Sequence, residues 1–314
     1  MSNAFVFPGQ GAQVVGMGAA LAEAFPVARE VFQEIDDALS QHLFRLMTEG
    51  PEAELTLTEN TQPALMAVSM AVVRVLAREG GIALAQKGRY VAGHSLGEYT
   101  ALCAAGALTV ADCARLLKLR GRAMQAAVPV GEGAMAALLG LDLEAAEAVA
   151  AEAAQGEVCA AANDNAPGQV VVSGHAAAVD RAIALAGEKG AKRAVKLAVS
   201  APFHCALMAP AAEAMAEALA AAAILPPDPP LVANVTAAPV EDPAEIRDLL
   251  VRQVTGAVRW RESVEFLRDH GVETVIELGV GNVLTGLVRR IDRSLQARAV
   301  STVADIESLI ADLQ

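Results

Sequence analysis

The sequence predicts a two-part α/β protein, in which a smaller unit is inserted into a larger one that is built on a parallel sheet. Apolar strands alternate with Ala-rich helices along the 314 residues, which is typical of α/β proteins. Residues 93–98 place a Gly-x-Ser-x-Gly pattern between an expected strand and an expected helix. A separate strand–helix–strand–strand–helix–strand pattern begins near residue 130.

The larger unit begins with an apolar strand at residues 4–7 that ends at a Pro-Gly-Gln-Gly turn. A helix is expected next at residues 61–77, with Thr61 as its cap and Pro63 in its first turn. A strand at 89–92 then leads into the Gly-x-Ser-x-Gly turn, and a short helix at 98–105 leaves it. Residues 110–126 predict a second long helix.

The inserted unit is expected to span residues 130–199, which leaves 1–129 and 200–314 for the larger unit. Strands are predicted at 134–141, 157–162, 169–173 and 192–199, and helices at 142–154 and 176–188. Asp142 is placed to cap the first of these helices, and the turn-rich residues 163–168 should join the two middle strands. This βαββαβ order is that of a ferredoxin-like unit.

The larger unit resumes with an Ala-rich helix at 210–225, which a proline-rich stretch at 226–230 closes. Strands follow at 231–235 and 273–278, and a last helix is expected from residue 283. A cleft between the two units is the natural place for a site.

Composition and charge exclude several classes of function. Aromatic residues make up only 3% of the chain and the net charge is −13, so we expect no nucleic-acid binding. No uncharged stretch is long enough to cross a bilayer, and the first residues lack the features of a signal peptide. The four cysteines show neither paired nor metal-ligand spacing, which favours a reduced, cytoplasmic setting without a metal.

The Gly-His-Ser-Leu-Gly-Glu stretch at 93–98 has the form of a nucleophile elbow, and the larger unit is therefore expected to be α/β-hydrolase-like. Glycine at 93 and 97 lets strand and helix approach closely. Ser95 would lie near the positive end of the following helix, where an oxyanion is stabilised.

Further motifs accompany this one over essentially the whole chain. They are Phe-Pro-Gly-Gln-Gly at 7–11, Arg-Gly-Arg at 120–122, Ser-Ala-Pro-Phe-His at 200–204, Arg-Gln at 252–253, Val-Arg-Trp at 258–260 and Glu-Leu-Gly-Val-Gly-Asn-Val-Leu at 277–284. In order and spacing the set resembles that of the malonyl-CoA:acyl carrier protein transacylases of type II fatty acid synthesis. The roles below are what this resemblance implies.

The resemblance implies that Ser95 is the nucleophile and His204 its general base. A carbonyl group at Gln253 would hold the histidine, where plain hydrolases use an acidic side chain. Gln10 and the backbone amide of Leu96 would form the oxyanion hole.

The resemblance also implies that Arg120 holds the distal carboxylate of a malonyl group. Phe203 is expected to exclude an α-methyl branch, as phenylalanine before the histidine accompanies malonyl selectivity in related transferases of polyketide assembly lines. The remaining substrate-binding candidates are Met124, Met135 and Asn165.

Other polar residues near these motifs are expected to have structural or surface positions and no role in the reaction. The His94 side chain should point to the other side of the turn and pack there. The basic side chains expected on a solvated helix face are Arg115, Lys118 and Arg122.

No cofactor is expected beyond the CoA thioester substrate, and the chain is expected to be a monomer. The second partner would be an acidic acyl carrier protein that docks on a local basic patch. The candidate side chains for this patch are Lys189, Lys192, Arg193, Arg289 and Arg290.

Two alternatives remain open at this level. A serine thioesterase or esterase of the α/β-hydrolase type shares the Gly-His-Ser-x-Gly pattern, although the chain offers no convincing Asp–His pair and His270 is its only late candidate. A transferase that supplies a polyketide pathway would carry the same chemistry.

Overall fold

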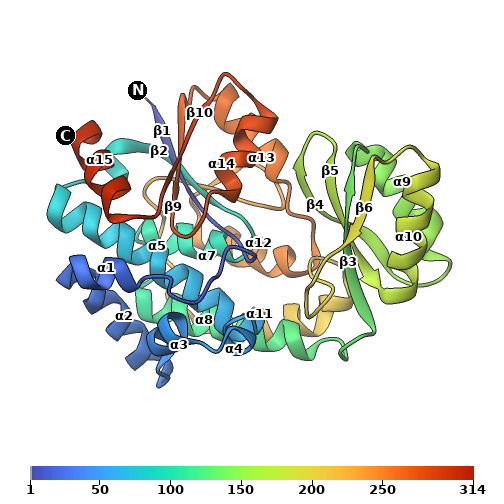
Figure 1. Cartoon of the computed structure of the whole chain (residues 1–314), viewed down its shortest axis with the longest axis horizontal. Helices are drawn as coiled ribbons and strands as arrows, with labels where there is room; N and C mark the ends of the chain where they lie inside the picture. The colour runs from blue at the N-terminus through green and yellow to red at the C-terminus, as the bar shows by residue number, and fades with distance from the viewer. Residues whose placement is uncertain (1) are drawn as a thin grey trace.

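The computed structural model describes residues 2–314, and the chain forms two sheets that lie apart from each other (Figure 1). The first sheet has six strands in the spatial order β10-β9-β1-β2-β7-β8. Its strands are β1 (Asn3–Phe7), β2 (Gly88–Gly93), β7 (Leu231–Val232), β8 (Pro239–Val240), β9 (Thr274–Leu278) and β10 (Gln296–Val300). All neighbours in this sheet are parallel except β7 and β8.

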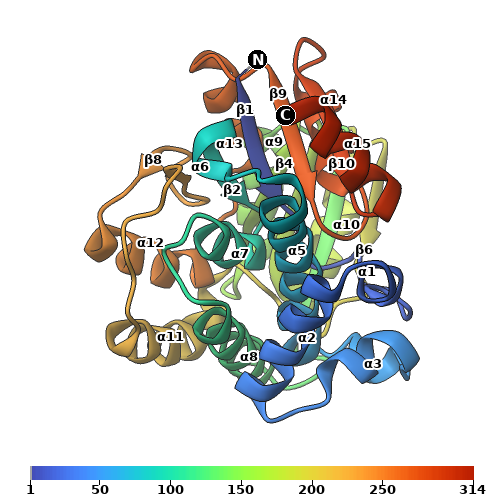
Figure 2. The same cartoon turned by 90° about the vertical axis from the view of Figure 1, so that its left-hand side faces the viewer.

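Both faces of the six-stranded sheet are covered, as the apolar run of β1 predicts for a central parallel strand. Phe5 and Phe7 point into the main core, whereas Ala4 and Val6 point into a second core on the opposite face. Figure 2 shows α2 (Pro26–Leu39), α5 (Thr58–Gly80) and α8 (Val110–Ala126) packed side by side next to the sheet. Residues of α13 (Trp260–Asp269) and α14 (Val283–Ile291) fill the second core.

The remaining helices complete the larger part of the molecule. They are α1 (Ala19–Ala24), α3 (Leu43–Glu49), α4 (Glu52–Leu55), α6 (Leu84–Lys87), α7 (Leu96–Ala104), the 3₁₀ turn η1 (Ala206–Met208), α11 (Ala209–Ala221), α12 (Pro243–Thr255) and α15 (Val303–Leu313). Within residues 2–314, no helix combines the length and apolar character that crossing a membrane requires.

The second sheet is antiparallel and has the order β4-β5-β3-β6. Its strands are β3 (Gly133–Leu139), β4 (Cys159–Ala166), β5 (Gln169–His175) and β6 (Arg193–Lys196). The helices α9 (Leu143–Ala154) and α10 (Ala176–Glu188) pack on one of its faces around a third, Ala- and Val-rich core. Asp142 caps α9 by accepting a hydrogen bond from the Ala145 N–H, as the sequence predicts.

The turn predicted at residues 163–168 is shorter than expected. Asn163 and Asp164 belong to β4, and the chain reverses only at 167–168. The strand continues because it stays paired with β5 as far as Ala166. On its other edge the Asp164 N–H donates to the Val258 carbonyl, and the Val258 N–H donates to the Ala162 carbonyl. This tertiary pairing overrides the turn propensity of the Asn-rich segment.

Three further expectations about the larger unit need correction. The helix predicted from Thr61 starts at Thr58, with Leu57 at its cap, so Pro63 lies inside it and Thr61 instead donates to the Leu55 carbonyl. The helix that starts at Val283 is not the last, because β10 and α15 follow it. Lys118 is buried, since it binds Glu59 and Asn60 across the α5–α8 contact.

Candidate active site

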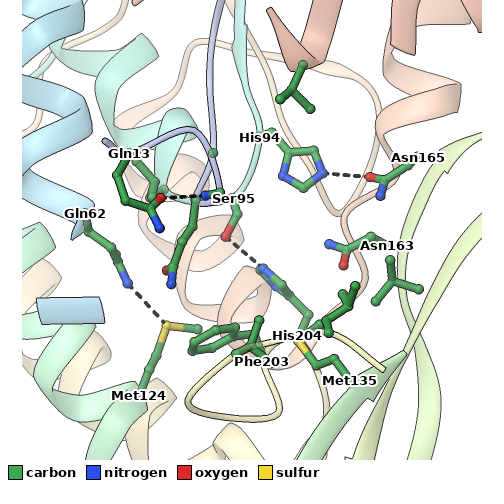
Figure 3. A pocket seen from close by; sticks show the side chains of 18 of the residues that line it. Gln13, Gln62, His94, Ser95, Met124, Met135, Asn163, Asn165, Phe203 and His204 are labelled. Atoms are coloured by element: carbon green, nitrogen blue, oxygen red, sulfur yellow. Dashed lines mark hydrogen bonds between the residues drawn. The ribbon is translucent and has the colours of Figure 1, made fainter. Parts of the chain in front are cut away.

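The site lies where the carboxyl ends of the parallel strands meet, which is where open α/β sheets place their ligands. Gln10 follows β1, Ser95 follows β2 and Asn234 follows β7, so the three loops converge on one edge of the sheet. Beside this edge is a cavity of about 260 Å³. Its wall is shared between the two parts of the chain, because Met135 of β3 and Asn165 of β4 face it across from Ser95 (Figure 3).

The turn that carries Ser95 is tight enough to require glycine on both sides. A Cβ atom on Gly93 would come within 1.9 Å of the Gly97 backbone, and one on Gly97 within 2.3 Å of the Phe7 carbonyl oxygen. Ser95 itself has φ 55°, a left-handed conformation that a residue other than glycine rarely adopts. Such strain is typical of functional positions, where surrounding structure holds the residue in place.

Asn234 supplies much of that support, and nothing in the sequence marks this residue except its place at the end of an expected strand. Its Oδ1 accepts the Ser95 N–H at 2.8 Å, and its Nδ2 donates to the Gly93 carbonyl at 2.7 Å. The side chain is 1% exposed, so these bonds form in a dry environment.

His204 lies beside Ser95 although the two are 109 positions apart, with 2.8 Å between Ser95 Oγ and His204 Nε2 (Figure 3). On the other side of the ring, Nδ1 lies 2.8 Å from the backbone carbonyl oxygen of Gln253 in α12. Because a carbonyl only accepts, Nδ1 carries the proton and Nε2 presents its lone pair to the serine hydroxyl. His204 also has a positive φ, 59°.

Burial controls the charge of this histidine. It is 3% exposed, and burial, with a further contribution from the Arg120 charge, lowers the pKa of His204 to about 3. The ring is therefore neutral over the physiological range, which is the state that can accept a proton. Within residues 2–314, no carboxylate contacts Nδ1, and a main-chain carbonyl takes the place that an acid occupies in other triads.

Arg120 reaches the same hydroxyl from α8. Its Nη2 donates to Ser95 Oγ at 3.1 Å and to Gln253 Oε1 at 2.8 Å, and its Nη1 donates to Gln62 Oε1 at 2.9 Å. The guanidinium is 1% exposed, although a basic helix sequence alone would place it at the surface. Burial lowers the pKa of Arg120, which nevertheless stays protonated at neutral pH. Gln62 was not anticipated from the sequence.

All predicted site side chains except Gln253 line this cavity, and Gln253 is buried behind Arg120 and Ser95. Figure 3 shows Phe203 between Met124 and His204 on the cavity wall. Gln10 is turned aside, because its Nε2 donates to Thr58 Oγ1 at 3.4 Å. The amide of Leu96 is the first of α7, where no preceding helical carbonyl is available to it.

The prediction that the His94 side chain points away from the site is wrong. The ring lines the cavity, and its Nε2 lies 2.8 Å from Asn165 Oδ1 of β4 (Figure 3). It also packs against the Trp260 ring with 5.8 Å between ring centroids. His94 does pack, but on the side of the cavity, because Asn165 of β4 supplies a polar partner there that the sequence pattern cannot reveal.

Comparison with known proteins agrees with this geometry. The sequence profile of the acyl transferase domain family matches residues 4–312. The malonyl CoA-acyl carrier protein transacylase of Escherichia coli K12 is 48% identical over 298 residues, which is 95% of each chain. The one from Bacillus subtilis strain 168 is 47% identical over 312 residues, covering 99% of this chain and 97% of that protein.

Solved structures extend the similarity to the fold. An acyl-carrier-protein-S-malonyltransferase from Bartonella henselae has a TM-score of 0.97 at 55% identity, covering 100% of this chain and 99% of that one. A malonyl-transacylase solved in complex with a type II polyketide acyl-carrier protein has a TM-score of 0.96 at 46% identity, covering 99% and 100%. The chain therefore belongs to the acyl transferase domain family and, within it, to the malonyl CoA-acyl carrier protein transacylases.

Proposed function

We propose that this protein transfers a malonyl group from malonyl-CoA to the phosphopantetheine thiol of acyl carrier protein and so supplies fatty acid synthesis. The observation that carries the proposal is the meeting of Ser95, His204 and a buried, charged Arg120 on one cavity wall. A hydrolase needs the first two residues, but only a substrate with a free carboxylate needs the third. The family of the chain supports the same reaction.

The first half-reaction begins when His204 Nε2 takes the Ser95 hydroxyl proton and the oxygen attacks the thioester carbonyl carbon. The tetrahedral intermediate carries its negative charge on the former carbonyl oxygen. When this intermediate collapses, the C–S bond breaks, and the thiolate of CoA leaves with the proton that His204 returns. Malonyl remains on Ser95 as an oxygen ester.

The second half-reaction repeats these steps in reverse with a new thiol. His204 takes the proton of the carrier thiol, the sulfur attacks the malonyl-serine carbonyl, and the Ser95 oxygen recovers a proton as it leaves. Gln253 holds the histidine through its backbone carbonyl in both halves. The contacts that hold Ser95 and His204 at positive φ also keep the two side chains aligned throughout.

The oxyanion hole is assigned to backbone N–H groups of Gln10 and Leu96. The Gln10 side chain is engaged with Thr58, which leaves its main chain as the candidate donor. The N–H of Leu96 opens α7, and the positive end of that helix adds to its effect.

Arg120 is assigned to the distal carboxylate of malonyl, for which a planar guanidinium offers two parallel N–H donors. Gln62 and Gln253 keep the guanidinium in place from two sides. The acyl chain would lie against Met124, Met135 and Phe203, and Asn165 would close the far wall through His94. We assign Phe203 to the exclusion of α-methyl branches.

We propose that acyl carrier protein docks on a patch of exposed basic side chains that reaches the cavity wall through Arg290. Arg289 and Arg290 are exposed on α14, and Arg290 donates to Gln169 Oε1 at 2.6 Å on the cavity wall. The other side chains of the patch are Lys189, Lys192 and Arg193, all exposed on the inserted unit. Lys192 lies against Gly140, which in turn contacts the Gly168 turn before Gln169.

Residues 130–199 form, in this proposal, a ferredoxin-like insertion into an α/β-hydrolase-like unit made of 1–129 and 200–314. The β4-β5-β3-β6 order supports it, since the first and third strands of the insertion are central. The protein would act as a monomer in the cytoplasm, where its four free cysteines stay reduced. It would need no cofactor or metal.

A mass measurement tests the reaction. The wild-type protein is incubated with malonyl-CoA alone, and its intact mass and the products are recorded. A malonyl adduct that is absent from Ser95→Ala, and that disappears when carrier protein is added, supports the proposal. Release of free malonate without carrier would assign the chain to the thioesterases instead, and no change at all would point to an inactive family member.

A further inference from the structure

A buried carboxyl group one turn after the nucleophile takes no part in the steps above. Glu98 lies in the first turn of α7 and is 1% exposed, among apolar neighbours such as Leu96 and Tyr99. Burying a carboxylate is unfavourable unless it is paired or hydrogen-bonded. The contacts that Glu98 makes therefore indicate what the residue does.

Glu98 is joined to Arg120 through one side-chain amide. Its Oε2 accepts from Gln253 Nε2 at 2.7 Å, and the Gln253 Oε1 accepts from Arg120 Nη2 at 2.8 Å. Gln253 Nε2 also donates to the Ser95 carbonyl at 2.8 Å. The amide can take only this orientation, since its reversal would face its NH₂ to the guanidinium and its oxygen to the carboxylate.

The Glu98 carboxylate and the Arg120 guanidinium carry opposite charges but are not in contact, because the Gln253 amide lies between them. Within residues 2–314, no carboxylate forms an ion pair with Arg120, and its three hydrogen bonds go to neutral oxygens. Burial raises the pKa of Glu98 to about 7, so the carboxylate form, whose charge complements Arg120, prevails above that pH. A direct Glu98–Arg120 pair would neutralise the guanidinium and compete with a substrate carboxylate, whereas the intervening amide supports the charge and leaves it available.

We propose that Glu98 is a positioning residue for acyl-group selection: acting through the Gln253 amide, it aligns Arg120 for the carboxylate of the substrate. This inference rests on the proposed function, in which Arg120 binds the distal malonyl carboxylate. It assigns to the Gln253 side chain a task separate from that of its backbone carbonyl, which faces His204.

The test compares malonyl-CoA with acetyl-CoA, which has no carboxylate, in Glu98→Gln. Glutamine keeps the size and one acceptor oxygen but removes the charge, so its bond to Gln253 weakens. We expect kcat/KM for malonyl-CoA to fall about 5- to 20-fold, mostly through KM, while the acetyl value changes less than about 2-fold. Equal losses for both substrates, or an unchanged ratio, would overturn the inference.

A double-mutant cycle separates positioning from a general structural effect. In the Arg120→Ala background, adding Glu98→Gln should not lower the malonyl-to-acetyl ratio further, because the group that Glu98 aligns is gone. Full additivity of the two effects on this ratio would contradict the proposal.

Glu277→Gln is the matched control, because Glu277 is also a fully buried carboxyl but caps α14 through the N–H groups of Leu284 and Thr285. It should lower the melting temperature and leave the ratio unchanged. If Glu98→Gln does not fold, Gln253→Met serves in its place. It removes the side-chain amide that joins Glu98 to Arg120 but keeps the backbone carbonyl that faces His204. The malonyl-to-acetyl ratio is expected to fall in this variant as well.

Wild-type malonyl transfer is measured first, so that the two ideas can fail separately. A wild-type protein without malonyl transfer would overturn the proposed function and this inference with it. If the wild type is active, but Glu98→Gln and Gln253→Met both keep the malonyl-to-acetyl ratio of the wild type, this inference alone would be overturned.

Discussion

Arg120 Nη2 donates to the hydroxyl oxygen of Ser95 over 3.1 Å, so the guanidinium of α8 contacts the side chain at the tip of the elbow directly. A malonyl group on Ser95 would bring its carboxylate within reach of the same side chain. The serine oxygen thus lies between the His204 imidazole and the Arg120 guanidinium. In the proposed reaction, the side chain that selects the substrate would therefore contact the reacting atom.

Replacement of Arg120 by alanine should separate the two acyl groups. We expect malonyl transfer to lose about 1.5–3 kcal/mol of transition-state stabilisation, the range for a hydrogen bond to a charged group, while acetyl transfer is spared or improves. Steady-state kcat/KM with each CoA ester measures this difference. Equal losses for malonyl and acetyl would mean that Arg120 serves the fold.

Removal of the base should slow both half-reactions. His204→Ala is expected to reduce transfer about 10²- to 10⁴-fold, because the hydroxyl of Ser95 and the carrier thiol then lack a general base. Single-turnover formation of the malonyl adduct, followed by mass, reports the first half-reaction directly. Near-normal adduct formation in a folded His204→Ala protein would refute the assignment.

The size of the side chain before the base should set the tolerance for branched acyl groups. Phe203 lines the cavity, and Phe203→Ser should raise methylmalonyl transfer relative to malonyl without ending malonyl turnover. Overpacking typically costs about 1–3 kcal/mol, which corresponds to roughly a 5- to 150-fold preference. Competition between the two CoA esters measures the ratio, and an unchanged ratio would place selectivity elsewhere on the wall.

Docking through exposed charges should depend on salt. If Lys192, Arg193, Arg289 and Arg290 attract an acidic carrier, transfer to the carrier should fall with ionic strength more steeply than transfer to free pantetheine. Substituting Arg289 and Arg290 by serine should flatten the carrier curve, whereas the same change at the distant Arg45, paired with Glu49, should not. Parallel curves for carrier and pantetheine would contradict the patch.

The pKa of His204, lowered to about 3 by burial, predicts an unusual pH dependence. The unfolded chain titrates near 6.5, so between pH 6.5 and 3 the unfolded state binds a proton that the folded state does not. His204 therefore reduces stability progressively as the pH falls through this window, and has no such effect above it. Thermal melts at several pH values should show a smaller acid loss in His204→Gln than in the wild type.

The low pKa of His204 should also determine how the reactivity of Ser95 depends on pH. A neutral sulfonyl fluoride that modifies Ser95 should react at a nearly constant rate from pH 7 down to about pH 5, because the base stays unprotonated over that range. A rate that halves near pH 6.5 would show that the histidine titrates as it does in water, which would contradict the buried environment described for it.

The local sequence pattern by itself determined several helices, one helix cap and the position of the elbow. The helices at Val110–Ala126 and Ala176–Glu188 have the bounds that the sequence predicts, and the Asp142 cap forms as expected. Gly93 and Gly97 locate the elbow, because only glycine permits so close an approach of strand and helix. The helix bounds, the Asp142 cap and the Gly93 position depend on neighbours within a few positions, which the sequence displays directly. Gly97 is also confined by the distant Phe7 carbonyl.

Tertiary structure alone decided which side chains share the cavity. Gln62 and Asn234 carry no local signal, and Glu98 belongs to the elbow motif without any sign of its contacts, since each of the three bonds to a partner at least 58 positions away. The same holds for the burial of Arg120 and for the extension of β4 through residues 163–166, where pairing with β5 and with Val258 outweighs turn propensity. The physical reason is that hydrogen bonds and desolvation are satisfied in space, and parallel strands bring their carboxyl ends together regardless of separation along the chain.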